Sequence, residues 1–225
     1  MTGTLFMVAT PIGNLSDLSD RTRSTLMEVD VVFAEDTRVA KRLLDHVGST
    51  VKVERYDHHS HDRQWPRVKE VIEHGRSVAY VSDAGVPGVE DPGGRLVAAL
   101  IESIPGATIV PIPGPSAVMC ALSISGFPAD RFAVAGFPPK KKGRKSYFDD
   151  VASQTTTVVL YESTHRIQKT VAEIAARQPD RRLVIARELT KKFETILRGT
   201  AREIADQLQS EVTKGEFIIV LGPTL

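Results

Sequence analysis

The sequence predicts an α/β fold built from two domains, because short apolar runs alternate along the chain with amphipathic stretches. In a chain of 225 residues, 41% hydrophobic and 25% charged, this alternation indicates buried, mainly parallel strands with helices on both faces of the sheet. The run Pro-Ile-Pro-Gly-Pro at residues 111–115 interrupts the series. We therefore expect an N-terminal domain over residues 1–113, with a mainly parallel sheet, and a C-terminal domain over residues 114–225, with a mixed sheet.

Each half has its own series of expected elements. In the N-terminal half, apolar runs predict strands at residues 5–9, 31–34, 51–53, 78–81 and 108–112. Helical periodicity between them predicts helices at residues 21–29, 39–47 and 65–74. In the C-terminal half, strands are expected at residues 132–135, 157–161, 183–186, 195–198 and 217–221. The helices of that half are expected at residues 144–152, 165–176 and 201–210.

Composition excludes several classes of protein. The 29 Lys and Arg residues nearly balance the 28 Asp and Glu residues, so any contact with RNA must come from local basic patches. Cys120 is the only cysteine, which excludes an intramolecular disulfide and a cysteine-based metal cluster and fits a reducing cytosol. The N-terminus lacks the pattern of a signal peptide, and no apolar run approaches the roughly 20 residues that span a bilayer. We expect a soluble, cytoplasmic protein.

Two loops rich in small residues follow expected strands, where ligands gather in folds of this kind. The first, residues 9–15, contains Pro11 and Gly13 but matches neither the dinucleotide-binding nor the phosphate-binding glycine pattern; it is either a tight turn or a close approach to a ligand. In the second, residues 82–94, Asp83 either accepts hydrogen bonds from a ligand, or caps a helix that begins near Gly93 or stabilises a turn. Similarly, Ser116 at the start of a helix is either a ligand contact or an ordinary cap.

Three further segments carry charge just beyond expected strands. Residues 35–38, 161–166 and 187–192 each combine a carboxylate with a cation, which fits salt bridges or a shared polar cleft. The histidine-rich residues 56–62 do not have the spacing of a zinc site, so we expect a solvated loop, in reach of substrate, and no metal.

Six of these motifs occur together in one order. They are residues 9–15, 33–38, 81–87, 113–117, 161–166 and 187–191. In this set and order the sequence resembles the ribosomal RNA small subunit methyltransferase I family, within the tetrapyrrole methylase superfamily. Members of that family methylate the ribose 2′-oxygen of a cytidine in the decoding region of 16S ribosomal RNA.

The resemblance implies a homodimer of two α/β domains of the tetrapyrrole methylase type, with S-adenosylmethionine in the cleft between them. The substrate it implies is 16S rRNA or the assembled small ribosomal subunit. The residues it places near the cofactor are Pro11, Asp83, Gly85, Val86, Ser116, Ala117, Tyr161, Glu162, Glu188, Leu189 and Pro223. Members usually continue past the segment that matches residues 221–223 into a helical region, and we expect any RNA contact from that region to be missing here.

The chemistry of the implied reaction selects further residues. A ribose hydroxyl is a weak acid, so a carboxylate within reach could take its proton, and the candidates are Asp36, Glu162 and Glu188. The cations expected to hold RNA phosphates are Arg38, Arg166, Arg187 and Lys191, with the basic run Lys140, Lys141, Lys142, Arg144 and Lys145.

Two alternatives to an S-adenosylmethionine-dependent rRNA (cytidine-2′-O)-methyltransferase stay open. One is a small-molecule methylase that acts on a tetrapyrrole-type ring, because one architecture serves several substrates. The other is a catalytically silent RNA-binding module that retains the fold.

Overall fold

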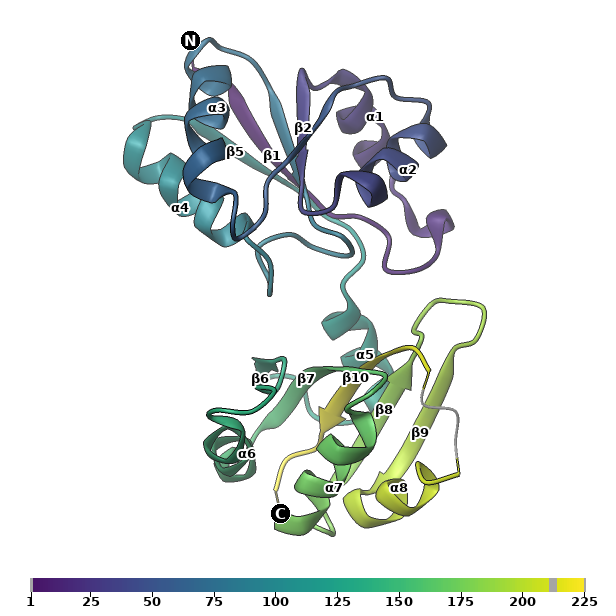
Figure 1. Cartoon of the computed structure of the whole chain (residues 1–225). Coiled ribbons are helices and arrows are strands. Elements are labelled where there is room, and N and C mark those ends of the chain that lie inside the picture. The colour runs from purple at the N-terminus through teal and green to yellow at the C-terminus, as the bar shows by residue number, and fades with distance from the viewer. Residues whose placement is uncertain (1, 211–213, 225) are drawn as a thin grey trace. The chain divides into compact units, whose positions relative to one another are not determined.

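The computed structural model describes residues 2–210 and 214–224, and the chain forms two compact units, Met1–Ser116 and Ala117–Leu225. Each unit contains one five-stranded sheet with helices packed on it (Figure 1). The expected fold class of two α/β domains is confirmed. The first unit extends to Ser116, beyond residue 113, because the backbone at Gly114 packs so tightly on Ala9 that an added Cβ would lie 2.9 Å from the Ala9 Cβ.

The sheet of the first unit is parallel throughout. Its strands are β1 (Thr4–Val8), β2 (Val31–Ala34), β3 (Val53–Arg55), β4 (Val78–Val81) and β5 (Thr108–Ile112). They lie in the order β3-β2-β4-β1-β5, and every pair is parallel. All residues of β2 and β4 are buried, as central strands covered on both faces must be.

Helices cover both faces of this sheet (Figure 1). One face packs against α1 (Asp20–Glu28) and α2 (Thr37–Val47), through residues such as Leu26, Leu43 and Leu44. The other face packs against α3 (His61–Glu73) and α4 (Gly93–Ser103), through Val68, Ile72, Leu96 and Leu100. A 3-10 helix, η1 (Leu15–Asp17), follows β1. Because the strands are parallel, the loops after β1, β2, β4 and β5 all leave from one edge of the sheet.

The sheet of the second unit is mixed. Its strands are β6 (Phe132–Gly136), β7 (Thr157–Ser163), β8 (Arg182–Arg187), β9 (Thr195–Thr200) and β10 (Glu216–Leu221), in the order β6-β7-β10-β8-β9. β6 and β7 are parallel, and the other neighbours are antiparallel. One face packs on α6 (Arg144–Ser153), α7 (Ile167–Arg177) and α8 (Ala201–Gln207), and the other on α5 (Ala117–Ser125).

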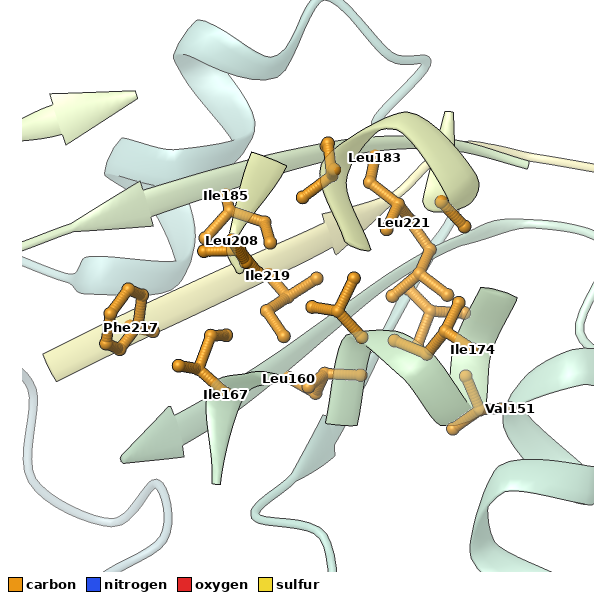
Figure 2. Packing of buried hydrophobic residues seen from close by; sticks show 14 of the residues in the cluster. Val151, Leu160, Ile167, Ile174, Leu183, Ile185, Leu208, Phe217, Ile219 and Leu221 are labelled. Atoms are coloured by element: carbon orange, nitrogen blue, oxygen red, sulfur yellow. The ribbon is translucent and has the colours of Figure 1, made fainter. Parts of the chain in front are cut away.

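Figure 2 shows the larger core of this unit, in which Leu160, Ile185 and Ile219 from neighbouring strands meet Ile167 and Ile174 of α7. These strand residues point to the same face because side chains alternate along a strand. Their neighbours in sequence, such as Val159 and Val220, point to the opposite face and pack on α5.

Some expected elements are displaced. β3 begins at Val53, not at Val51, because Val53 is the first residue in register with β2, and Val51 only packs on the neighbouring core. α3 begins at His61, not at Trp65, since Pro66 stands inside the helix instead of at its start. The sequence predicts only where α4 and α5 begin, near Gly93 and Ser116, and not where they end. In the described part of the chain, no helix has the length and apolar character required to cross a membrane.

We expect Ile219→Ala to lower the free energy of unfolding of the second unit by about 2–5 kcal/mol, because it leaves a cavity in the centre of the sheet. Ile219 is 0% exposed, whereas Val134 on the edge strand β6 is 40% exposed, so Val134→Ala serves as the matched control with an expected loss below about 1 kcal/mol. Hydrogen exchange of the β7, β8 and β10 amides measures this directly. Equal protection in the two variants would contradict the assigned core.

Candidate active site

Two loops at the carboxyl edge of the first sheet are joined by a pair of backbone hydrogen bonds. The Thr10 N–H donates to the Gly85 carbonyl at 2.9 Å, and the Gly85 N–H donates to the Thr10 carbonyl at 3.1 Å. Gly85 has a φ of 83°, and a Cβ there would lie 3.3 Å from Ile12 Cγ2. A side chain at position 85 would therefore push the first loop away from the second.

The structure thus brings together several residues expected to contact the cofactor. Pro11 lies in the first loop, Asp83, Gly85 and Val86 in the second, and Ser116 ends the segment that begins with Gly114 packed on Ala9. The first loop is itself shaped by Asn14, whose side chain accepts a hydrogen bond from the Ser16 N–H at 3.0 Å. Ala117 is the first residue of α5 and belongs to the second unit.

A pocket of about 260 Å³ opens between these loops and α2, and we call it the first-loop pocket. Thr10, Pro11 and residues 81–83 line it, together with Leu43 of α2. Thr10 is 3% exposed, and its hydroxyl has no hydrogen-bond partner among the residues that the structure describes. A buried hydroxyl without a partner is costly, so the pocket is suited to a ligand that carries polar groups.

A second pocket, of about 440 Å³, is lined almost entirely by charged and polar side chains, and we call it the polar pocket. It is lined by residues 35–38, Arg55, residues 57–59 and Asp83. Asp83 also lines the first-loop pocket, so the two pockets adjoin at this carboxylate.

The histidine-rich segment is only partly the solvated loop expected from sequence. His58 and His59 are exposed in the polar pocket, but Tyr56 and His61 are buried. The Tyr56 hydroxyl is hydrogen-bonded to His61 Nδ1, and the His61 ring stacks on Trp65 with centroids 6.5 Å apart. The apolar core beneath the sheet edge holds these rings, and burial lowers the pKa of His61.

The Asp36 carboxylate is hydrogen-bonded to and ion-paired with Arg38. One carboxylate oxygen caps α2 by accepting the Arg38 N–H at 2.8 Å, and the other lies 2.6 Å from the Arg38 guanidinium. These hydrogen bonds from Arg38 lower the pKa of Asp36 well below its usual range. An ionised carboxylate held in this way is a weak base, so the contacts argue against Asp36 as the proton acceptor.

Asp83 does not cap the helix near Gly93, so that alternative from sequence is wrong. Its Oδ1 instead accepts the Asp36 N–H at 3.0 Å, and burial raises its pKa. The N-cap position of the helix is Pro92, which has no side-chain cap, and Asp91 before it accepts the Gly93 N–H at 2.7 Å and the Gly88 N–H at 2.8 Å. The sequence carries a signal for this contact, because Asp91-Pro-Gly places an acceptor just before a helix start.

In the second unit, Glu162 is buried in a network of hydrogen bonds. Its side chain is 0% exposed and accepts from Arg166 at 2.8 Å, from the Ser163 N–H at 2.7 Å and from the Thr170 hydroxyl at 2.5 Å. Arg166 also donates to the Pro138 carbonyl at 2.8 Å. Glu162 therefore fixes the turn before α6 through Arg166, which does not fit contact with a substrate hydroxyl.

Arg144 was expected to contact RNA, but its side chain is buried. Although it lies within the basic run, its guanidinium is 6% exposed, pairs with Glu173 at 2.9 Å and donates to Thr170 at 2.8 Å. It also lies 4.9 Å from the centroid of the Phe148 ring. These contacts occupy the guanidinium, so Arg144 anchors α6 to α7, while Lys140, Lys141, Lys142 and Lys145 are exposed.

A third pocket, of about 800 Å³, brings two of the three charged segments together. It is lined by residues 163–165, Arg187, Glu188, Lys191, Phe193 and residues 214–216. Residues 35–38, the remaining segment, belong to the first unit. Tyr161 stacks on Phe137 with centroids 5.1 Å apart, Leu189 packs on the α5 face of the core, and Pro223 is half-buried after β10.

Glu188 stands in this third pocket on a left-handed backbone, with a φ of 50°. Its Oε1 accepts from Lys191 at 3.0 Å and from the Glu216 N–H at 2.8 Å. Burial raises the pKa of Glu188, but the hydrogen bonds from Glu216 and Lys191 outweigh burial and leave the pKa lowered. Glu188 is thus an ionised acceptor, suited to binding hydroxyl groups more than to removing a proton.

The sequence did not single out two residues at the carboxyl edge of the first unit's sheet, Asp91 and Glu35. Asp91 organises the second loop, and Glu35 lines the polar pocket one position before Asp36. Nothing in the sequence separates Glu35 from Asp36, since both are carboxylates that follow the same strand.

Comparison with known proteins identifies the family. A family model described as Tetrapyrrole (Corrin/Porphyrin) Methylases matches residues 4–205. The protein named "Ribosomal RNA small subunit methyltransferase I" of Halalkalibacterium halodurans is 40% identical over 220 residues, covering 97% of this chain and 75% of the relative. The protein of that name from Neisseria meningitidis serogroup B is 41% identical over 224 residues, covering 98% of this chain and 76% of the relative.

The chain belongs to the ribosomal RNA small subunit methyltransferase I family. Solved structures agree on the fold of this family. Uroporphyrin-III-C-methyltransferase from Thermus thermophilus aligns with a TM-score of 0.67 at 19% identity, covering 98% of this chain and 94% of that chain. Diphthine synthase aligns with a TM-score of 0.72 at 16% identity, covering 99% of this chain and 91% of that chain. At such low identity, similarity to these two structures shows the fold alone.

The family uses S-adenosylmethionine as its cofactor, and the residues at the sheet edge fit this molecule. The Thr10 hydroxyl, unpartnered within the described residues, offers a hydrogen bond to a polar ligand. The Asp83 carboxylate, which lines the first-loop pocket, can accept from hydroxyl or ammonium groups.

We expect Gly85→Ala to weaken binding of S-adenosylmethionine by about tenfold, or about 1.4 kcal/mol, because the new methyl group displaces Ile12 and the first loop. Gly48 provides the matched control. It has a similar φ of 75°, but an added Cβ would meet nothing within 4 Å. Both variants should lose about 1–2 kcal/mol of stability from backbone strain. Calorimetry of cofactor binding then separates them, and equal affinity in the two variants would show that the Gly85 loop does not border the cofactor.

Proposed function

We propose that the chain is an S-adenosylmethionine-dependent rRNA methyltransferase that methylates the ribose 2′-oxygen of a cytidine in the decoding region of 16S ribosomal RNA. The observation that carries the proposal is 40% identity over 97% of the chain to a protein named for small-subunit rRNA methylation. The polar pocket beside the first-loop pocket supports it, because a ribose and its phosphates need charged and polar partners.

The proposal includes the setting of the reaction. The substrate is 16S rRNA or the assembled small ribosomal subunit, which places the enzyme in the cytoplasm, and the active form is a homodimer. Bound S-adenosylmethionine supplies a methyl group that is already activated. The chain's part is to bind and orient both partners, to exclude water and to take up a proton.

We propose that the residues expected near the cofactor contact it. In the first unit these are Pro11, Asp83, Gly85, Val86 and Ser116. Of these, Pro11 and Asp83 line the first-loop pocket, where the Thr10 hydroxyl is an added donor. The residues of the second unit in this proposal are Ala117, Tyr161, Leu189, Glu188 and Pro223. Glu188 is the one whose ionised carboxylate would accept from a cofactor hydroxyl. Asp36 and Glu162, also expected near the reaction, are proposed to position Arg38 and Arg166.

We propose RNA contacts for cations of two kinds, those that line the pockets and those exposed on the surface. Arg38 is 84% exposed at the rim of the polar pocket, and the half-buried Arg187 and Lys191 line the third pocket. The four exposed lysines of the basic run form what we call the lysine cluster: Lys140, Lys141, Lys142 and Lys145. Such exposed cations bind phosphates without reading sequence.

The decisive experiment is transfer of radiolabelled methyl from S-adenosylmethionine to small ribosomal subunits that lack the modification, followed by nuclease mapping of the label. We expect label on a single 2′-O-methylated cytidine in the decoding region. Label on a base or on another RNA would overturn the assignment of the substrate. Transfer to a tetrapyrrole would identify a small-molecule methylase, and RNA binding without affinity for the cofactor would identify a silent RNA-binding module.

We expect neutralisation of the lysine cluster to flatten the salt dependence of RNA binding and to leave cofactor affinity unchanged. The slope of log K against log salt should become less steep by about 0.7–0.9 for each phosphate that the variant no longer neutralises. Filter binding at several salt concentrations measures this slope. The control removes four dispersed cations: Arg21, Lys41, Lys69 and Arg202. Equal slopes in the cluster variant and the parent would remove the cluster from the interface.

A further inference from the structure

Glu35 differs from the other carboxylates that line the polar pocket. Asp36 is paired with Arg38, and Asp83 accepts the Asp36 N–H. Asp57 accepts from the Ser60 N–H at 2.7 Å and pairs with Arg55 at 2.6 Å. Within residues 2–210 and 214–224, by contrast, no hydrogen-bond donor or cation pairs with the half-buried carboxylate of Glu35. Its oxygens are therefore available to a hydroxyl group placed in the pocket.

The groups around Glu35 raise its pKa. Burial has the largest effect, followed by the negative charges of Asp83 and Asp91 from the loop after β4. From the loop before α3, Asp57 acts in the same direction and His58 in the opposite one. Tyr80 of β4 interacts electrostatically with Glu35, and burial raises the pKa of the Tyr80 hydroxyl, which stays protonated. A carboxylate with a raised pKa is a stronger base near neutral pH than one held by cations.

Glu35 lines the polar pocket, and this pocket adjoins the first-loop pocket at Asp83, which lines both. A ribose in the polar pocket would therefore lie next to the loops that we propose to border the cofactor. Arg38 and Arg55 line the same pocket and are exposed by 84% and 64%, so they can meet the flanking phosphates.

We propose that Glu35 is the catalytic base, which accepts the proton of the substrate hydroxyl as the methyl group is transferred. This inference rests on the proposed function as a ribose methyltransferase. The 2′-oxygen forms a bond to the methyl carbon, and the bond between that carbon and sulfur breaks with its electron pair left on sulfur. The hydroxyl proton moves to a carboxylate oxygen of Glu35, from which it passes to solvent after the product leaves.

The kinetic test compares Glu35→Gln, Glu35→Asp and the parent in methyl transfer to small ribosomal subunits over a range of pH. For the parent, kcat/KM should rise with pH through the pKa of Glu35, because only the ionised carboxylate accepts a proton. Glu35→Gln should lower kcat by about 10²- to 10⁴-fold and lose this rise. Glu35→Asp should recover part of the rate, and all variants should keep their affinity for S-adenosylmethionine.

The matched control is Glu102→Gln, which removes an exposed carboxylate from α4 and should leave the rate and its pH dependence unchanged. The inference is overturned if Glu35→Gln keeps kcat within about twofold of the parent, or if it is slow but retains the rise with pH. If the parent methylates no RNA while it binds the cofactor, the proposed function fails.

A measurement without substrate tests Glu35 independently of the proposed function. In protein labelled with ¹³C at the glutamate carboxyl carbon, the resonance that is absent from Glu35→Gln should titrate above the ordinary range of glutamate, which is about 4.3. Because no described donor holds the carboxylate, this resonance should also shift little when Arg38 is replaced by Gln. A pKa at or below the ordinary range would show that Glu35 is already held by a partner and would overturn its role as the base.

Discussion

Two backbone hydrogen bonds between Thr10 and Gly85 determine how the first unit presents its loops. In a parallel sheet the strands end at one edge, but nothing in the sheet itself decides how the loops beyond that edge approach one another. The hydrogen bonds between Thr10 and Gly85 fix how these two loops approach each other. This pairing requires at position 85 a residue that adopts a positive φ and has no side chain facing Ile12. The first-loop pocket and the shared position of Asp83 both follow from this pairing.

Buried charges serve a different purpose in the second unit. Glu162, Arg166, Thr170 and Arg144 form one connected set of hydrogen bonds beneath the turn that leads into α6. A buried ion must have its partners, so such a set adds little net stability but strongly favours one arrangement of the elements it joins. Here it joins β7 and α7 to the start of α6, next to the lysine cluster. The exposed lysines therefore stand on a rigid base although their own side chains are free to move.

The polar pocket illustrates how a site can separate the roles of similar side chains. Several carboxylates lie in or near it, and most are occupied by backbone N–H groups or arginines that hold the loops in place. Those contacts take up oxygens of the occupied groups, and within the described part of the chain they leave both oxygens of Glu35 available. Proton transfer and loop structure are thus assigned to different residues of one pocket. This is how catalytic groups with a raised pKa are usually arranged in clefts.

Hydrophobic patterning by itself determined the domain class and most of the strands. The bounds predicted for the strands at residues 31–34 and 78–81 are those of β2 and β4, because these buried parallel strands are continuous apolar runs that end abruptly at polar residues. The bounds predicted at residues 108–112 are those of β5, which is followed by the breaker run Pro113-Gly114-Pro115. The order of the motifs indicated the family, and the loops that follow the strands indicated where the site lies.

Only the tertiary structure decided what each charged residue does there. Asp91, and not Asp83, accepts the first N–H of α4, and Arg144 is buried while its neighbours are exposed. Asp36 is held by Arg38, whereas Glu35 has no such partner among the described residues. The physical reason is that the role of a charge depends on which distant donors and cations surround it, and no local pattern in the chain records those contacts.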